Sequence, residues 1–188
     1  MIDAIAELSA EQGYEATKIA DIVRRAGVAR KTLYDNFDGK EDLFLSAFDH
    51  YFEETRRAVE DACEATGGAW QQRIESGVAA FLRCVEERPA AARLCMIEAL
   101  SATPEASARY DAALREFVEL LKRNAPDDTD LPPTVEETLV GGVAWILNQQ
   151  IRKGSASRAG ELLSELSEFI LSPYRDVARK GVNATRRK

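Results

Sequence analysis

Apolar residues recur at intervals of three and four residues along almost the whole chain. Ile19, Ile22, Val23 and Ala26 show this interval in one segment, and residues 43–52 show it in another. The spacing places side chains on one face of an α-helix, whereas a half-buried strand requires alternating apolar and polar residues. No alternating run of Val, Ile, Thr and aromatic residues occurs in the sequence. The pattern predicts an all-α protein.

Composition narrows the class of protein. The chain has 188 residues, of which 45% are hydrophobic and 30% charged. These values are typical of a globular protein of one or two domains and not of a disordered chain. No apolar run approaches the roughly 18 residues that span a bilayer, and no basic segment followed by an apolar one begins the chain. We therefore expect a cytoplasmic protein with no membrane contact.

Cysteine and histidine are too few and too dispersed for a structural metal site. Cys63, Cys84 and Cys95 lie far apart, and His50 is the single histidine. An odd number of cysteines without a Cys-x-x-Cys pair also argues against a disulfide framework. The sequence contains no recognisable nucleophile motif, paired carboxylates or Gly-rich phosphate loop. We expect no metal, no cofactor and no enzymatic activity.

The first 40 residues predict three helices. One runs from the start to about Gln12, a second follows Thr17 as its N-cap, and a third spans about 29–36. Only a Gly27-Val28 turn separates the second helix from the third, which predicts a helix-turn-helix.

This motif carries a concentration of positive charge. The net charge of the chain is −7, yet the segment 17–34 has a local charge of +4. The difference matters because binding to phosphates depends on a local excess of Lys and Arg and not on the total charge. The charged residues of the segment are Lys18, Arg24, Arg25, Arg30 and Lys31, opposed by Asp21.

A cationic helix-turn-helix is suited to duplex DNA, because its second helix enters the major groove. Side chains at the start of that helix reach base edges, and hydroxyl and ammonium groups around it reach phosphates. An alternative stays open, since helical hairpins with solvated charges are common and the same face suits an acidic protein partner without a specific DNA site. We assign base contacts to Arg30, Lys31 and Thr32, next to Ala29 at the helix start, and phosphate contacts to Thr17, Lys18, Tyr34 and Lys40.

The residues of this segment resemble those of a known family. Gly13-Tyr14-Glu15-Ala16-Thr17, Ile19-Ala20-Asp21-Ile22-Val23, the segment 26–37 and Lys40-Glu41-Asp42-Leu43-Phe44 are similar to the TetR family of transcriptional regulators. The resemblance is specific over about residues 2–48 and architectural beyond them. It implies a three-helix DNA-binding domain, a helical C-terminal domain that binds a small-molecule effector, and a homodimer on a palindromic operator. It also implies a repressor that the effector releases from DNA.

Four positions depart from the family pattern. Ala29 stands where a Ser or Thr cap is usual, so the start of the third helix loses a side-chain acceptor. Lys31 replaces a small residue, Asn36 replaces an aromatic residue or His, and Ser9 replaces Phe. The resemblance also implies that the chain begins within the first helix, so we expect some phosphate contacts of a basic arm to be missing.

The remainder of the chain predicts further helices and three regions. We divide the chain into a helix-turn-helix domain over 1–48, a helical effector-binding and dimerisation domain over 49–174, and a basic tail over 175–188. Pro173 is expected to end the last helix, and the tail is expected to be disordered. The predicted helices span about 40–65, 69–88, 89–100, 104–124, 134–153 and 158–171, with a long loop over 125–133.

In the family the effector pocket lies among the helices that follow the long connector. On this basis we nominate apolar and sulfur-containing side chains of that region, with Tyr110 and Gln149 as polar groups. The plainer interpretation is that Met and aromatic residues at helical spacing form the core. The nominated residues are Phe81, Cys84, Met96, Leu100, Tyr110, Phe117, Trp145 and Gln149.

The last two predicted helices, 134–153 and 158–171, resemble the dimerising pair of the family. Gly141 and Gly142 allow close approach of two helices, and a two-fold dimer matches a palindromic operator. The alternative is that both helices complete the core of a monomer. The expected partners are therefore a DNA operator, a small-molecule effector and a second copy of the chain.

Overall fold

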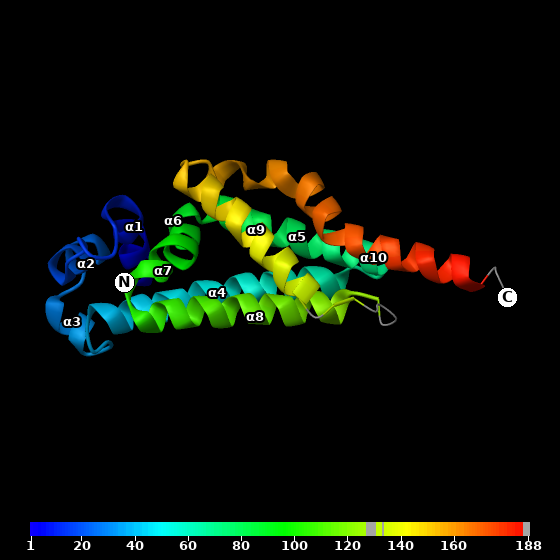
Figure 1. Ribbon diagram of the computed structural model, residues 1–188. Helices are drawn as coiled ribbons and strands as arrows, with labels where there is room; N and C mark the ends of the chain where they lie inside the picture. Colours follow the sequence, from blue (N-terminus) through cyan, green and yellow to red (C-terminus); the bar gives the residue numbers. More distant parts are fainter. Residues whose placement is uncertain (127–130, 133, 186–188) are drawn as a thin grey trace.

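The computed structural model describes residues 1–126, 131–132 and 134–185, with the backbone alone for 176–185. Every regular element in these ranges is helical, which confirms the all-α prediction. The molecule is elongated, with its first three helices at one end and the end of its last helix at the other (Figure 1). No helix of the described ranges is long and apolar enough to cross a membrane.

The N-terminal end consists of α1 (Ile2–Gln12), α2 (Ile19–Ala26) and α3 (Arg30–Tyr34). Gly27 follows α2 with a left-handed backbone (φ 66°), which a residue with a side chain adopts only at a cost. The helix-turn-helix is present, although α3 is shorter than the predicted range. The prediction that Thr17 caps α2 is wrong, because Lys18 occupies the N-cap position and no side chain caps the helix.

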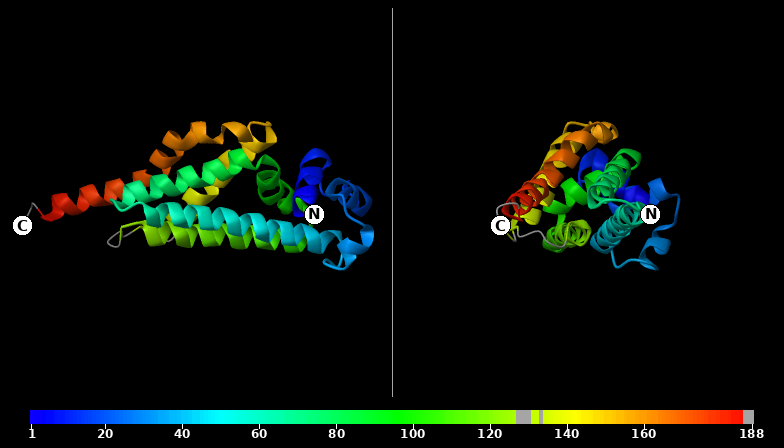
Figure 2. Two further views of the ribbon diagram at one scale, coloured as in Figure 1. Left: turned by 180° about the vertical axis from the view of Figure 1, so that it is seen from behind. Right: turned by 90° about the vertical axis from the view of Figure 1, so that its right-hand side faces the viewer.

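Two long helices form the body of the molecule. Helix α4 (Lys40–Ala65) starts beside α3 and runs next to α8 (Pro104–Asn124), as both views of the ribbon show (Figure 2). Thr103 accepts a hydrogen bond from the Ala106 amide, so it caps α8 as Thr-Pro sequences do. Helix α4 crosses the predicted domain boundary at residue 48 without a break.

Helix α5 (Trp70–Glu87) packs closely on α4. At Gly77 a Cβ atom would lie 2.7 Å from the Cys63 sulfur, so only glycine permits this approach. The predicted helix over 89–100 is instead three consecutive pieces: α6 (Pro89–Arg93), a π turn (Leu94–Glu98) and α7 (Ala99–Ala102). A π turn accommodates an additional residue, which no local sequence pattern indicated.

The C-terminal part consists of α9 (Thr134–Arg152), a 3-10 turn (Ala156–Leu162) and α10 (Leu163–Thr185). The prediction that Pro173 ends the last helix is wrong, since Pro173 lies inside α10. Proline cannot donate to the carbonyl four residues earlier, and the Ser172 hydroxyl donates to that Phe169 carbonyl instead (3.1 Å).

The basic tail is also corrected in part. Because α10 continues to Thr185, the expected disorder does not apply to the backbone of 175–185. Residues 186–188 lie outside the described residues, as do 127–130 and 133 of the predicted long loop.

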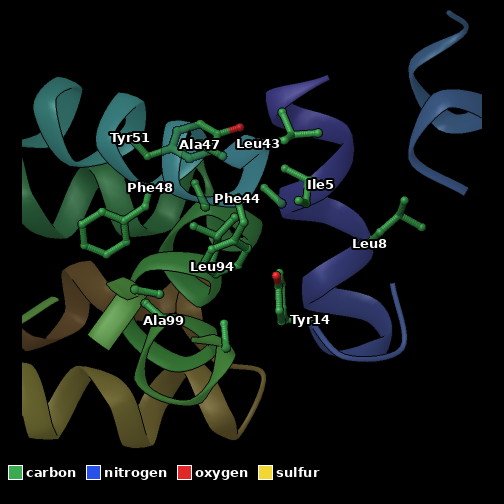
Figure 3. Close-up of a cluster of buried hydrophobic side chains, with 14 of the residues drawn as sticks. Ile5, Leu8, Tyr14, Leu43, Phe44, Ala47, Phe48, Tyr51, Leu94 and Ala99 are labelled. Carbon is green, nitrogen blue, oxygen red and sulfur yellow. The ribbon is translucent and has the colours of Figure 1, made fainter. Parts of the chain in front are cut away.

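The main hydrophobic core joins the two predicted domains, because it contains residues of both 1–48 and 49–174. Ile5 of α1 and Phe44 of α4 are buried with Leu94 of the π turn and Ala99 of α7, around the ring of Tyr14 (Figure 3). A second cluster connects α5, the π turn, α9 and the 3-10 turn. The N-terminal helices therefore rest on α4, α6, the π turn and α7 through one continuous apolar interface.

Candidate DNA-binding surface and ligand cavity

Helix α3 presents one face to the core and one to solvent. Leu33 of α3 and Ile22 of α2 are fully buried and hold the two helices together. Arg30, Lys31 and Thr32 are exposed on the opposite face. The Arg30 guanidinium lies 5.6 Å from the centre of the Tyr34 ring and donates to its hydroxyl (3.3 Å). This stacking gives Arg30 a defined direction on the exposed face.

The positive charge of the motif divides into two groups. Arg25 turns back to α1, where it pairs with Glu7 (2.9 Å) and Glu11 (2.8 Å). Its hydrogen bond holds the pKa of Glu11 below the usual value. Arg24 pairs with Asp21 within α2 (2.6 Å). The charge of these two arginines is therefore partly neutralised within the protein.

The cations that remain are Lys18, Arg30 and Lys31. None of them forms an ion pair with a residue that the structure describes, and all three are exposed. They lie at the start of α2 and the start of α3, where a helix-turn-helix faces DNA. Ala29 precedes α3 as its N-cap and supplies no side-chain hydrogen bond, as its lack of a polar side chain predicts.

The side chains of two residues nominated for phosphate contacts form hydrogen bonds to the protein's own backbone. Thr17 is 1% exposed, and its hydroxyl donates to the Gly13 carbonyl (2.8 Å). This placement corrects the nomination of its hydroxyl for phosphate, because the hydroxyl is turned away from the surface. The Lys40 ammonium donates to the Tyr14 carbonyl (3.0 Å) and lies 4.0 Å from the centre of the Tyr14 ring. Both side chains order the segment between α1 and α2.

A cavity of about 370 Å³ lies mainly among α4, α5 and α8. Its size is within the range of small-molecule pockets. Five of the eight nominated pocket residues line it: Phe81, Cys84, Met96, Tyr110 and Phe117.

The other three nominated residues do not line the cavity. Leu100 and Trp145 are 40% and 66% exposed, and Gln149 lies on α9 away from the lining residues Val140, Val143 and Ala144. Leu100 is nominated as an apolar residue of the helices after the connector, but it follows the π turn on α7 and is exposed there. One face of α9 lines the cavity, and Trp145 lies on another face of the helix, which points outward.

The inside of the cavity is uncharged. All three cysteines of the chain line it, and burial raises the pKa values of Cys63 and Cys84 and that of Cys95 to about 12. These thiols therefore stay protonated at neutral pH and behave as small apolar groups. Burial also raises the pKa of Tyr110, which keeps its hydroxyl neutral. The arrangement favours an apolar molecule.

Charged side chains gather at one place on the cavity wall. Glu54, Glu87 and Arg88 are the charged residues of the described lining, and all three are exposed. Arg88 pairs with Glu54 (2.5 Å) across the gap between the end of α5 and α4. We identify this place as the mouth of the cavity. The sequence did not indicate this mouth, because acidic and basic residues at the end of a helix before a proline are common.

A second apolar feature lies on the outer face of α9 and α10. Trp145 is 66% exposed, and Phe169 of α10 is 39% exposed. A Cβ atom at Gly142 would lie 3.1 Å from the Phe169 ring, so the glycine lets this ring rest on α9. Large exposed aromatic residues on neighbouring helices are typical of a protein interface.

Comparisons with known proteins agree with this geometry. The family described as bacterial regulatory proteins, tetR family, matches residues 1–47. An uncharacterised HTH-type transcriptional regulator, YezE of Bacillus subtilis, is 30% identical in an alignment of 154 positions that covers 76% of this chain and 76% of YezE. The fatty acid metabolism regulator protein of Bacillus subtilis is 44% identical over 48 residues, about a quarter of each chain.

A solved structure extends the likeness over the whole fold. The transcriptional regulator FadR from Bacillus subtilis, in complex with stearoyl-CoA, superimposes with a TM-score of 0.80. The match covers 92% of this chain and 96% of FadR at 18% sequence identity. At that identity the likeness concerns the fold.

Proposed function

The chain belongs to the TetR family of bacterial regulatory proteins, and from this membership we propose that it is a repressor whose release from DNA is driven by an apolar ligand. The protein is a DNA-binding transcriptional regulator. The finer assignments, namely the contact residues, the ligand class, the sense of regulation and the dimer, are our proposal. We also propose that it acts on a palindromic operator in the cytoplasm.

The DNA contacts are proposed for the exposed cations and polar groups around α3. Arg30, Lys31 and Thr32 would face base edges, with Ala29 allowing close approach of the helix start. Lys18 and Tyr34 would contact phosphates. Support comes from three exposed cations at the starts of α2 and α3 that form no ion pair with a described residue, and this observation carries the proposal. Lys40 retains free ammonium donors beside its bond to Tyr14 and is proposed as a further phosphate contact.

The effector is proposed to occupy the cavity among α4, α5 and α8. Its lining is uncharged apart from the three residues at the mouth, which supports a ligand with a sizeable apolar part, such as an alkyl or acyl chain. The stearoyl-CoA of the FadR relative has such a chain, which makes this ligand class a reasonable first choice. The mouth at Arg88 places a polar end of the ligand at the surface.

The operator contacts are tested by titrating the protein against duplex DNA from its own upstream region and against a scrambled duplex at fixed salt. We expect at least about a hundredfold preference for the upstream duplex, with two subunits per site. Arg30→Ala and Lys31→Ala should each weaken operator binding by about 1–3 kcal/mol. Arg158→Ala removes the same charge from the turn before α10 and should leave the affinity unchanged.

Two results would contradict the proposal. Equal and steeply salt-dependent binding to both duplexes would indicate contacts with phosphates alone. Unchanged operator affinity of both α3 variants, with native circular dichroism, would exclude α3 as the recognition helix.

A further inference from the structure

The peptide groups around Tyr14 connect the helix-turn-helix to the rest of the molecule. The Tyr14 amide donates to Oε2 of Glu98, which belongs to the π turn (3.0 Å, buried). The Tyr14 carbonyl accepts from the Lys40 ammonium at the start of α4. The Tyr14 ring packs edge-on against Phe44 (4.7 Å between ring centres). Both ends of this residue's backbone are therefore fixed by groups from outside α1 and α2.

The segment that Glu98 holds leads directly into α2. Gly13 ends α1 with φ 85°, and its carbonyl accepts the Thr17 hydroxyl. The Thr17 amide donates to the Tyr14 carbonyl (3.1 Å), and α2 begins two residues later. A displacement of Tyr14 is therefore transmitted to α2, and through the short Gly27-Val28 turn to α3.

The other oxygen of the Glu98 carboxylate faces the last residue of α6, which immediately precedes the π turn. Glu98 is buried, and Arg93 lies 3.3 Å from its second oxygen, Oε1. Two residues of the same turn, Cys95 and Met96, line the cavity. A π turn packs less regularly than an α-helix and is often found at functional positions. The turn thus has cavity residues on one side and the Glu98 carboxylate on the other.

Figure 3 shows how directly these parts adjoin. Tyr14 lies between the end of α1 and the helix that carries Leu94 and Ala99, with Phe44 beside it. A second contact runs parallel to the first, since the Tyr51 hydroxyl donates to Asp3 of α1 (2.7 Å) and Tyr51 lines the cavity. The Tyr51 contact reaches α1 alone, whereas the Glu98 contact reaches the segment that positions α2.

We propose that the Glu98–Tyr14 hydrogen bond couples the cavity to the DNA-binding surface. A ligand that displaces Cys95 and Met96 shifts the π turn, Glu98 moves with it, and the segment 13–17 no longer holds α2 and α3 in the DNA-binding arrangement. Glu98 is thus a positioning residue for the response and contacts neither ligand nor DNA. This inference rests on the proposed function and specifies how its two sites communicate.

The test uses octyl methanethiosulfonate, an alkyl reagent, as a stand-in for the unidentified ligand. Labelling is carried out at pH 9, where a small fraction of the cavity thiols is deprotonated although burial raises their pKa values. The thiolate attacks the sulfenyl sulfur of the reagent, a mixed disulfide forms and methanesulfinate leaves, which places an octyl chain in the cavity. The protein is returned to neutral pH before DNA binding is measured. Mass spectrometry identifies the labelled cysteine. The dissociation constant for the upstream duplex is measured for labelled and for unlabelled protein. The response is the first constant divided by the second.

We expect labelling to weaken operator binding of the unaltered protein at least tenfold. Glu98→Ala should reduce this response to less than threefold, and Glu98→Gln should preserve most of it, because the amide oxygen still accepts from the Tyr14 amide. The matched control is Glu86→Ala, since Glu86 also accepts a backbone hydrogen bond, from Gly160 (2.8 Å), but between α5 and the 3-10 turn. Its response should equal that of the unaltered protein.

A second measurement is independent of whether Glu98→Ala folds. Hydrogen exchange of the Tyr14 amide should accelerate when the unaltered protein is labelled. Unchanged protection of this amide, or a full response in folded Glu98→Ala, would overturn the coupling while leaving the proposed function intact. Specific operator binding without any response of the unaltered protein to labelling would instead contradict the proposed ligand control, and the coupling with it.

Discussion

Ser9 is the residue whose surroundings fit its side chain least. It is fully buried in α1, and its hydroxyl has no hydrogen-bond partner in the described structure. A polar group that is buried without a hydrogen-bond partner has given up its hydrogen bonds to water and forms none in the protein, which lowers the free energy of unfolding. The family resemblance places a large apolar Phe at this position. The serine therefore contributes less to the stability of the core around the first helix than an apolar residue would.

Replacing Ser9 with Ala should therefore stabilise the protein. We expect the free energy of unfolding, measured by urea denaturation, to increase by about 1 kcal/mol. Ser107→Ala, in the first turn of α8, is the control: it makes the same substitution in a helix and so measures the gain in stability from helix propensity. A gain for Ser9→Ala no larger than that of Ser107→Ala would mean that the buried hydroxyl is satisfied in solution.

The packing of α4 on α5 depends on a missing side chain. At Gly77 an added Cβ would lie 2.7 Å from the Cys63 sulfur and 3.4 Å from a methyl carbon of Val59. All three residues line the cavity, so the separation of the two helices also sets the width of the ligand site. This close contact is a property of the helix pair and of neither helix alone.

Gly77→Ala should separate α4 and α5 and lower the free energy of unfolding by about 1–3 kcal/mol, as overpacking does. Adding Cys63→Ala removes the sulfur that the new methyl group meets, so the double variant should recover most of the loss. Urea denaturation of the two single variants and the double variant measures this coupling. Purely additive effects would show that the helices adjust without strain.

At the scale of the whole molecule, one apolar face on α9 and α10 is exposed and is covered by no other part of the described chain. Trp145 and Phe169 stay exposed on α9 and α10, at the side of the molecule away from the cavity lining of α9. A two-fold dimer through this face would bury both aromatic residues and set two α3 helices on a palindrome, with centres roughly 34 Å apart on DNA.

If these helices form the dimer, Trp145→Ser should shift the protein from dimer to monomer in light scattering coupled to size exclusion. Operator affinity should fall with it, because one subunit contacts only a half-site. Leu100→Ser is the control, since Leu100 is also an exposed apolar residue but lies on the short helix α7. Dissociation by Leu100→Ser alone would place the interface elsewhere.

Local sequence was sufficient for the features that depend on neighbouring residues. The apolar spacing of α2 and α4, the turn at Gly27 and the start of α8 near residue 104 each depend on side chains a few positions apart. The DNA-binding motif was accessible for the same reason, as its helices, turn and charges lie within 24 consecutive residues, 17–40.

Tertiary structure decided the features that bring distant residues together. The pairing of Arg25 with α1 and the pairing of Arg88 with Glu54 at the mouth of the cavity both involve partners from other segments. The π turn and the continuation of α10 through Pro173 also escaped the sequence, because packing and the Ser172 hydroxyl offset locally unfavourable geometry. Periodicity identifies the buried face of each helix, whereas the empty space between α4, α5 and α8 exists only once three such faces are packed.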